Sequence, residues 1–404
     1  MISIPLFASI SMLCCADDPS TEELKILYQE VQDLKTKYIE LTKTNQPVDL
    51  QEVKSIDQSV NPLTNSINLN LYGMLRADAS YQLEGGNTIF NRINKVDLID
   101  QQTNNNNLYT TVSTTRLGLD IKFRKETKQD LSAKLEMDFR GGTNLDSARI
   151  RHAYINYGNW LVGQTTTNFV SNEFVPEMID FGSPAGIGTL RTPMLKYSIN
   201  QNENSQYAFA LEEGRTDNRF PTLTAKIKHE FDQKKVAVSA RGLLQELKIK
   251  EVDDQNKLSW GAAIGVSYKI NKKLQLKGDY SYVYGDDTFM LYTNRAYVIA
   301  NDKAALNEFN AFTLGLTYQL NPKLRNTLGY GAIFADKKNQ FAQQIISNND
   351  QTQNKNLQQI WLNFLYMPTS SLTFGLEYTY GERQTFLNQL GKDNRINSMV
   401  RFIF

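Results

Sequence analysis

The chain has 404 residues, of which 41% are hydrophobic and 22% charged, and its 44 basic side chains nearly balance its 43 acidic ones. No run of about eighteen apolar residues occurs, which excludes membrane-spanning helices, so any membrane span must consist of strands. A formal charge of +1 lacks the basic excess of nucleic-acid-binding proteins, so we expect no nucleic-acid partner.

Residues 1–16 have the features of a secretion signal peptide. An apolar stretch at 4–13 ends in small residues and is followed by polar ones. We expect the segment to be removed, and the missing positive charge at its start leaves the true start codon open. Its Cys14 and Cys15 are the only cysteines of the chain, so removal leaves no disulfide and no thiolate metal site. Lipidation of either cysteine is an alternative, which is disfavoured because neither follows a small residue.

Residues 20–43 are predicted to form a helix. Ser20 and Glu23 have the spacing of a capping box, and an apolar pattern follows directly. The apolar residues occupy the a and d positions of consecutive heptads: Leu24, Leu27, Val31, Leu34, Tyr38 and Leu41. This narrow seam favours a coiled coil over the alternative, a lone amphipathic helix that packs on its own domain. Residues 44–66, which are rich in polar side chains, are predicted to be a linker.

From residue 67 to the last residue the hydrophobic period is two, which is typical of strands. Leu69, Leu71 and Leu75 alternate with polar residues such as Arg76 and Asp78. A soluble β-sandwich also alternates, but many of these runs last ten to fourteen residues, against about 5 to 6 in soluble strands. Because a tilted membrane-spanning strand needs about 9 to 11 residues, the run length favours a transmembrane barrel.

The connections between these strands are expected to be short and long in turn. Tight turns are predicted at 125–130, 232–235, 271–273, 321–323 and 368–371, and long polar stretches at 82–108, 168–190, 285–307 and 338–355. Short turns at one end and long loops at the other are the pattern of outer-membrane barrels. The predicted fold is therefore all-β, an antiparallel transmembrane β-barrel of about sixteen strands over residues 67–404, or roughly 21 residues for each strand and connection. A barrel of this size should enclose an aqueous channel.

The stretch 168–190 is more apolar than an external loop needs to be. Phe169, Phe174 and Phe181 accompany Asp180 and Pro184 there. We predict that it folds into the lumen, buries these residues against the inner wall and narrows the pore. The alternative is an external loop with a small core of its own.

The lumen-facing positions are predicted to be rich in cations. By strand parity they include Arg76, Arg116, Lys134, Arg140, Arg149, Arg151, Arg191, Lys196, Arg241 and Arg401. Guanidinium groups in a water-filled constriction bind carboxylates through charge-assisted hydrogen bonds, which predicts a preference for anions. The alternative is a neutral polar wall, in which these cations only satisfy carboxylates of the same parity such as Asp78, Asp120, Glu136 and Asp138.

Four consecutive motifs resemble the DcaP-like outer-membrane porins. They are ARIRHAYINY at 148–157, the following GNWLVGQT, VPEMIDFGSPAG in the long loop, and LRTPMLKYS, which ends at Ser198. The resemblance is specific over 116–198, and the overall plan of 20–404 agrees with it. The sequence departs from the family pattern at Ser183, where a second glycine is expected, and at Lys196, where arginine is expected. Lysine keeps the charge of arginine but loses its planar fork.

The resemblance implies a bacterial outer-membrane homotrimer with periplasmic N-terminal coiled coils. It implies that the pore passes small anionic solutes such as dicarboxylates, and that its surroundings are outer-membrane lipid. By motif, Arg149, Arg151, Arg191 and Lys196 would line the pore, and Glu177 would join Asp180 in the inserted loop.

Other functions receive less support from the sequence. The only histidines, His152 and His229, have no metal ligand at a suitable spacing, so neither a metal nor another cofactor is expected. A barrel lipase or protease would need an ordered Ser, His and orienting residue, and Ser147 lies on a different phase of the strand from His152, so we expect no enzyme. A saccharide porin and a closed structural or adhesion barrel remain the alternatives.

Overall fold

The structure, a computed structural model, describes residues 67–404 except 102–104, 124–129, 216–217, 250 and 252–254. The predicted signal peptide, coiled-coil helix and linker lie outside these residues and stay predictions. No helix among the described residues is long and apolar enough to cross a membrane.

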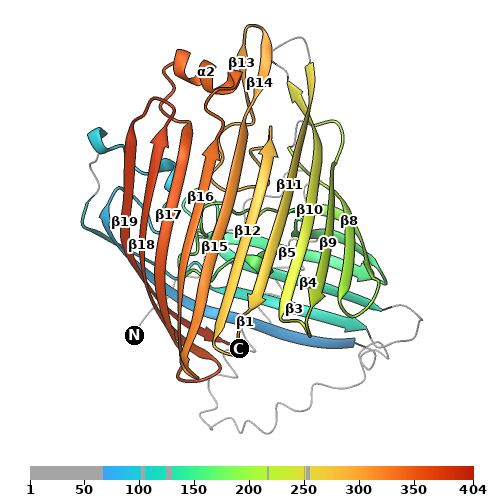
Figure 1. Cartoon of the computed structure of the whole chain (residues 1–404). Coiled ribbons are helices and arrows are strands. Elements are labelled where there is room, and N and C mark those ends of the chain that lie inside the picture. Colours follow the sequence, from blue (N-terminus) through green and yellow to red (C-terminus); the bar gives the residue numbers. More distant parts are fainter. Residues whose placement is uncertain (1–66, 102–104, 124–129, 216–217, 250, 252–254) are drawn as a thin grey trace, which may run out of the picture. The chain divides into compact units, whose positions relative to one another are not determined.

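The described chain forms one closed antiparallel sheet (Figure 1). Its strands are β1 (Ile67–Glu84), β2 (Asn107–Thr111), β3 (Arg116–Phe123), β4 (Leu131–Gly141), β5 (Ser147–Tyr157), β6 (Trp160–Thr166), β7 (Arg191–Asn200), β8 (Ser205–Glu212), β9 (Thr222–Phe231), β10 (Val236–Ile249), β11 (Gln255–Lys269), β12 (Leu274–Tyr284), β15 (Glu308–Asn321), β16 (Leu324–Ala335), β17 (Asn354–Tyr366), β18 (Leu372–Thr385) and β19 (Leu390–Ile403). The first strand pairs with the last, with Arg76 opposite Arg401, and this pairing closes the barrel.

The barrel wall has sixteen strand positions, as predicted. The sheet contains 17 strands, but β2 and β3 pair with consecutive stretches of β1 and together fill one of these positions. Short turns lie at one end, near the C-terminus, and long loops at the other (Figure 1). The loops contain the short 3₁₀ helices η3 (Ile93–Lys95), η4 (Ile99–Gln101) and η5 (Asn172–Phe174), the hairpin of β13 (Tyr297–Ala300) and β14 (Lys303–Leu306), and the helix α2 (Gln340–Ser347).

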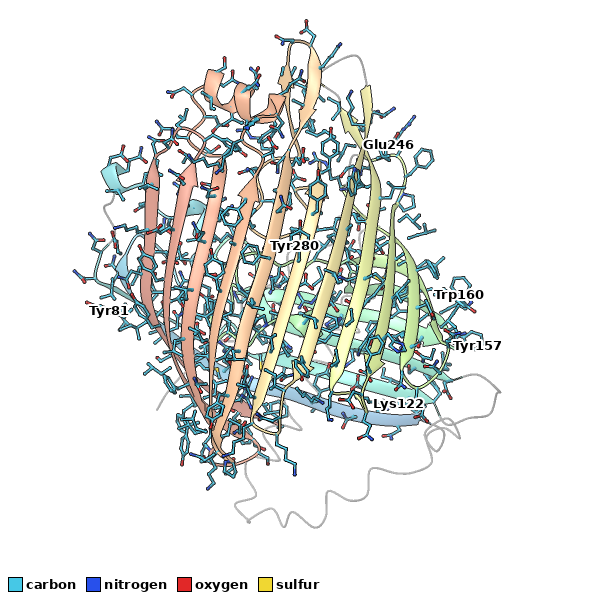
Figure 2. All side chains as sticks on the ribbon, viewed as in Figure 1. Tyr81, Lys122, Tyr157, Trp160, Glu246 and Tyr280 are labelled. Atoms are coloured by element: carbon cyan, nitrogen blue, oxygen red, sulfur yellow. The ribbon has the colours of Figure 1, made fainter. Side chains whose placement is uncertain are left out.

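The outer face of the wall is apolar and exposed, and the inner face is polar and buried. Leu69 and Leu71 on β1 are 62% and 68% exposed, whereas Arg76 and Asp78 on the same strand are 8% and 5% exposed. Aromatic residues such as Tyr280 also lie on the outer face (Figure 2). An apolar surface that surrounds the whole wall is stable only against lipid, which confirms the transmembrane barrel over the soluble sandwich.

A bulge in β5 changes the side of the sheet to which one residue points. Glu136 of β4 pairs with His152 and Met137 pairs with Ile150, so Arg151 has no residue opposite it. A bulged residue twists the strand and lets two neighbours share a face. Arg151 is 7% exposed and contacts interior carboxylates, so the guanidinium and the neighbouring imidazole both lie on the inner side.

The long loops pack against one another and against the inner wall near their end of the barrel. Their core contains Ile93 from the 85–106 loop, Phe169 from the 168–190 loop, Phe289 from the 285–307 loop and Phe341 of α2. All four side chains are at most 1% exposed. The loops are therefore a packed part of the fold, and their core positions the site described next.

Candidate functional site

Residues 168–190, called the inner loop below, run along the inner wall. Glycines make room for this path: a Cβ added to Gly265 of β11 would lie 2.5 Å from Phe174 Cδ2, and one added to Gly375 of β18 would lie 2.7 Å from Ile179 Cδ1. The wall glycines that the inner loop approaches in this way are Gly261, Gly265, Gly315, Gly331 and Gly375. The apolar residues of the inner loop are therefore buried against the wall.

A buried carboxylate on β18 holds the middle of the inner loop. Glu377, 1% exposed, accepts hydrogen bonds from the backbone N–H groups of Ile179 (2.7 Å) and Asp180 (3.0 Å). Asn363 and Asn397 donate to the same carboxylate. The two backbone bonds fix the inner loop at one point of the wall, and the two asparagines hold the carboxylate in place.

The acidic side chains of the inner loop bind cations of the wall beside it. Glu177 forms two hydrogen bonds with Arg325 of β16, at 2.6 and 2.7 Å. Asp180 pairs with Arg395 of β19, which also pairs with Asp393, and all three side chains are buried. Glu177 is thus neutralised at β16, whereas Asp180 and Asp393 share the charge of Arg395 on β19.

Pro184 is buried where the inner loop turns back. The adjacent Ala185 donates its N–H to Gln359 Oε1 (3.1 Å) and accepts from Thr313 Oγ1 (2.6 Å). These bonds attach the returning segment to β17 and β15.

Three loops meet at Gly182 of the inner loop. The hydroxyl of Tyr292, from the 285–307 loop, donates to the carbonyl pair of Gly182 and Ser183, at 2.5 and 2.8 Å. The Phe90 carbonyl oxygen of the 85–106 loop lies 3.4 Å from the place of a Cβ on Gly182. Phe90, Ser183 and Tyr292 have φ values of 56°, 72° and 64°, in the left-handed region that side chains disfavour. Ser183, where the family pattern has glycine, therefore occupies a backbone conformation that glycine would adopt without strain.

Next to these anchors lies a group of guanidinium groups that we call the arginine cluster. Its members are Arg76, Arg116, Arg140, Arg149, Arg151 and Arg191. Arg149 binds both oxygens of Asp138, at 2.7 and 2.9 Å, and keeps 43% of its side chain exposed. Arg151 bridges Glu136 (2.9 Å) and Asp138 (2.7 Å) and is buried. The two arginines that the motif singled out therefore share a carboxylate.

Arg76 and Arg116 extend the cluster onto β1 and β3. Arg76 pairs with Asp78 at 2.6 Å and donates to the Ile179 carbonyl at 2.5 Å, which links the cluster to the inner loop. Arg116 Nε lies 3.3 Å from Glu136, so this carboxylate serves two arginines. Arg116, Arg149 and Arg151 are thus joined through Glu136 and Asp138, and Arg76 forms a separate ion pair with Asp78.

Arg140, Arg191 and Lys196 have no carboxylate within ion-pair distance in the part of the chain that the structure describes. Arg140 donates weakly to Ser113 Oγ, and Arg191 to the Thr189 carbonyl, both at 3.4 Å. Arg191 Nε is buried without a hydrogen-bond partner among the described atoms. These positive charges are the least neutralised in this region.

Two aromatic rings cover the cluster. The Phe181 ring of the inner loop lies 5.5 Å from the guanidinium carbon of Arg76 and 5.9 Å from that of Arg151. Phe90 lies 4.9 Å from the guanidinium carbon of Arg140 and 5.9 Å from the Phe181 ring. Cation–π attraction holds the guanidinium groups in place, and the lowered hydration beside the rings reduces the screening of their charge.

The charges on this side of the interior do not balance. With the arginine cluster and Lys134, the inner faces of β1, β3, β4, β5 and β7 carry more cations than their carboxylates, which are Asp78, Asp120, Glu136 and Asp138. Two carboxylates of the inner loop form their ion pairs outside the cluster: Glu177 pairs with Arg325 of β16, and Asp180 pairs with Arg395 of β19, the strand next to β1. The site is a locally electropositive region in a chain of formal charge +1.

His152 lies beside the cluster, where its Nδ1 is 2.9 Å from Thr165 Oγ1. A search of the described residues finds no group of three His, Cys, Asp or Glu side chains that could hold a metal ion.

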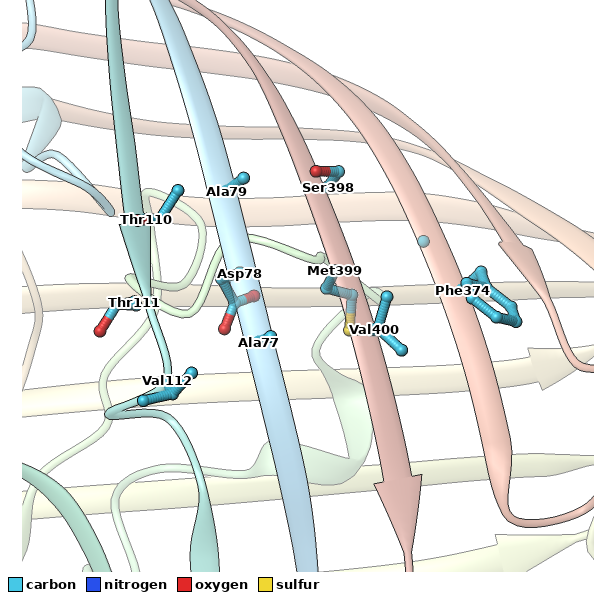
Figure 3. A pocket seen from close by; sticks show the side chains of 11 residues that line it. Ala77, Asp78, Ala79, Thr110, Thr111, Val112, Phe374, Ser398, Met399 and Val400 are labelled. Carbon is cyan, nitrogen blue, oxygen red and sulfur yellow. The ribbon is translucent and has the colours of Figure 1, made fainter. Parts of the chain in front are cut away.

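A separate feature lies on the outer wall, where a groove of about 610 Å³ crosses β2, β1, β19 and β18 (Figure 3). Ala77, Ala79, Thr110 and Ser398 contribute small outward side chains to it, and Phe374 borders it. The rest of the outer wall carries mainly larger residues.

Comparisons with known proteins agree with this architecture. The model of the DcaP outer membrane protein family matches residues 16–404. The crystal structure of the outer membrane channel DcaP of Acinetobacter baumannii shares 37% sequence identity, with a TM-score of 0.79 over 84% of this chain and 98% of that chain. A comparison with curated proteins gave no match.

Two more distant structures share the fold. An anion-selective porin from Comamonas acidovorans has 11% identity and a TM-score of 0.57, over 84% of this chain and 100% of that chain. The trimer form of OmpT, an outer membrane protein of Vibrio cholerae, has 12% identity and a TM-score of 0.55 over the same shares. The family match and the 37% identity confirm the resemblance seen in the motifs, and the chain belongs to the DcaP outer membrane protein family, a family of outer-membrane channels.

Proposed function

We propose that this porin conducts small anions, and that small dicarboxylates are its preferred solutes. The observation that supports this most is the excess of cations over carboxylates in the arginine cluster, where Arg140 and Arg191 have no ion-pair partner among the described residues. An unneutralised positive field in a water-filled passage attracts anions and repels cations.

The preference for two carboxylates follows from the spread of donors. Arg149 is half-exposed, so water and a solute can reach it, and Arg191 and Lys196 offer further donors on β7. A dianion can bind a guanidinium with one carboxylate while the other binds a second cation. In this proposal Arg76, Arg116, Arg149, Arg151, Arg191 and Lys196 line the pore, and the inner loop with Glu177, Asp180, Phe181 and Pro184 forms its constriction.

We propose further that the end with the short turns faces the periplasm, which is the usual orientation of outer-membrane barrels, and that the N-terminal coiled coil lies there. We propose a homotrimer in which the outer groove at β1 and β19 belongs to the subunit contact, because small residues let two walls approach closely. The trimer form of a protein with the same fold supports this assembly.

The test of conduction is the reversal potential of the full-length protein in a planar bilayer with a salt gradient. Anion selectivity is expected, and a small dicarboxylate such as succinate should reduce the chloride current at low concentration. A cation-selective potential would contradict the proposal. An unselective pore that passes neutral sugars would support a saccharide porin instead.

The test of assembly is the mass of the detergent-solubilised protein by light scattering. Ala79→Trp should reduce the trimer, whereas Ala262→Trp, on the outer face of β11, should leave it intact. A trimer that withstands Ala79→Trp would exclude the groove from the contact, and a monomeric native protein would contradict the assembly.

A further inference from the structure

A second group of cations lies on the inner wall at β9 and β10, away from the arginine cluster. Lys226 of β9 is the direct cross-strand partner of Arg241 on β10, and Lys228 follows two residues later on the same face. Like charges directly opposite each other destabilise a sheet. Because such a pair destabilises the sheet, its presence on the inner wall indicates that the positive charge there contributes to function.

One carboxylate of the inner loop binds both lysines. Glu173, in the short helix η5, places Oε1 at 3.1 Å from Lys226 Nζ and Oε2 at 2.7 Å from Lys228 Nζ. Ser171 completes the group, since Lys226 donates to its hydroxyl, which donates in turn to Glu173. Each oxygen of the carboxylate thus has its own lysine, an arrangement that the carboxylate of a solute can also adopt.

Glu173 is among the more exposed interior carboxylates, together with Glu177 (32%) and Asp120 (28%). Its side chain is 37% exposed, whereas Asp138 and the Arg241 partner Asp279 are 0% and 7% exposed. Burial on its own raises the pKa of Glu173, but Lys226 and Lys228 outweigh this effect and lower the pKa below its ordinary value. Glu173 is therefore ionised at neutral pH, and an exposed ion pair of this type can exchange its partner.

Two further lysines flank the group without a hydrogen bond or ion pair to any other described side chain. Lys196 of β7 lies near enough to Lys226 to feel its repulsion, and Lys277 of β12 is near enough to be attracted by Glu173. The region therefore carries five cations, namely Lys196, Lys226, Lys228, Arg241 and Lys277, against the three carboxylates that pair with them, Glu173, Glu230 and Asp279. Lysine ammonium groups are compact, hydrated and mobile, which suits a transient contact with a passing anion.

We propose that Lys226 and Lys228 form a second binding station for carboxylate solutes, which Glu173 occupies in the resting channel and leaves when a solute carboxylate replaces it. The inference rests on the proposed anion conduction and adds a site to it. A solute would pass from the arginine cluster to the lysine pair, with Glu173 as a tethered competitor at the second contact.

The test is the block of chloride current by succinate in single channels of the full-length protein. Glu173→Gln removes the competitor and keeps both lysines, so the dwell time of succinate should rise by about tenfold. The joint variant Lys226→Gln and Lys228→Gln should shorten the dwell time below that of the native channel. Glu382→Gln is the control, because Glu382 lies on the outer face of β18, where it accepts a hydrogen bond from Tyr380 (2.5 Å), and the succinate dwell time should stay native in this variant.

The outcomes separate this inference from the proposed function. If the native channel is anion-selective but Glu173→Gln leaves succinate dwell times unchanged, the station is excluded and conduction stands. If Glu173→Gln only adds current noise, without longer dwell times, Glu173 is an anchor of the inner loop and the station is likewise excluded. A native channel without anion selectivity would contradict the proposed function itself.

Discussion

Glu377 on β18 accepts the backbone N–H of Ile179 at 2.7 Å, and so attaches the inner loop to the wall of the barrel from within. The same carboxylate binds the Asp180 N–H and two asparagine amides, and it is almost fully buried. A buried donor that loses its acceptor costs about 1 to 3 kcal/mol. The position of the inner loop therefore depends on this one side chain more than on any exposed ion pair.

Glu377→Ala should release the middle of the inner loop. Single-channel recordings should show added current noise, and limited proteolysis should cut within 168–190. Glu382→Ala is the control, because Glu382 lies on the same strand but on its outer face, where it accepts from Tyr380 (2.5 Å). Quiet currents and a protected loop in Glu377→Ala would show that other contacts hold the loop.

Ser183→Gly should stabilise the folded protein by about 0.5 to 1 kcal/mol, because Ser183 has a φ of 72° that glycine adopts without strain. The measurement is the midpoint of unfolding in urea with the protein in detergent micelles. Ser239→Gly is the control: Ser239 lies inside β10, where glycine should lower stability by a similar amount. A lowered midpoint in Ser183→Gly would mean that the Ser183 side chain stabilises the folded protein by more than its strained backbone destabilises it.

Gly315→Ala should displace the inner loop, since a Cβ there would lie 2.4 Å from the Pro176 Cβ. Overpacking of this kind typically costs about 1 to 3 kcal/mol. Gly242→Ala is the matched control, because an added Cβ on Gly242 meets nothing within 4 Å. Conductance and the unfolding midpoint should change only in Gly315→Ala, and equal behaviour of the two variants would contradict the described path of the loop.

The stability of the loop region should depend on pH through Asp286. This fully buried residue accepts hydrogen bonds from Gln245, Thr288 and Phe289, and burial raises its pKa to about 6. The folded state thus holds the proton more tightly than the unfolded chain, where aspartate titrates near about 3.9. The stabilisation is complete below about pH 4 and is lost as the pH rises through 6, by about 3 kcal/mol at most.

Urea unfolding between pH 4 and 7 measures this effect. The decline in the free energy of unfolding should be weaker in Asp286→Asn than in the native protein. Glu203→Gln, at an exposed position in the turn before β8, should keep the native decline. A native protein whose stability rises over this range and does not respond to Asp286→Asn would contradict the assignment.

The barrel could be predicted from the sequence because its signal is repeated along the whole wall. Period-two alternation and the contrast of tight turns with long loops recur along the whole barrel wall. An error in the assignment of one strand therefore changes the predicted fold little. Phe169 and Phe174, the apolar residues from which a segment folded into the lumen was predicted, are buried in the structure.

The details of the site could not be predicted in the same way. Strand parity cannot detect the bulge that turns both Arg151 and His152 inward, because one inserted residue shifts the count. The pair of Asp180 with Arg395 joins residues more than two hundred positions apart, and Phe90 comes from a loop without a motif. The alternation of Asp393, Arg395 and Asn397 along β19 is a signal from which a polar inner face could have been predicted there.

The arginine cluster allows a direct test of anion conduction by mutation. Arg149→Ala with Arg151→Ala removes the two central guanidinium groups but leaves Asp138 and Glu136 with fewer partners. Arg191→Gln avoids this complication, because Arg191 has no ion-pair partner in the described part of the chain. Arg219→Ala, at an exposed loop position paired with Glu246, serves as the control.

The decisive measurement is the reversal potential of these four proteins in one salt gradient. The native channel and Arg219→Ala should be equally anion-selective, and both the double variant and Arg191→Gln should shift toward zero. A native channel that prefers cations, or variants that keep the full native potential, would contradict the role assigned to the cluster.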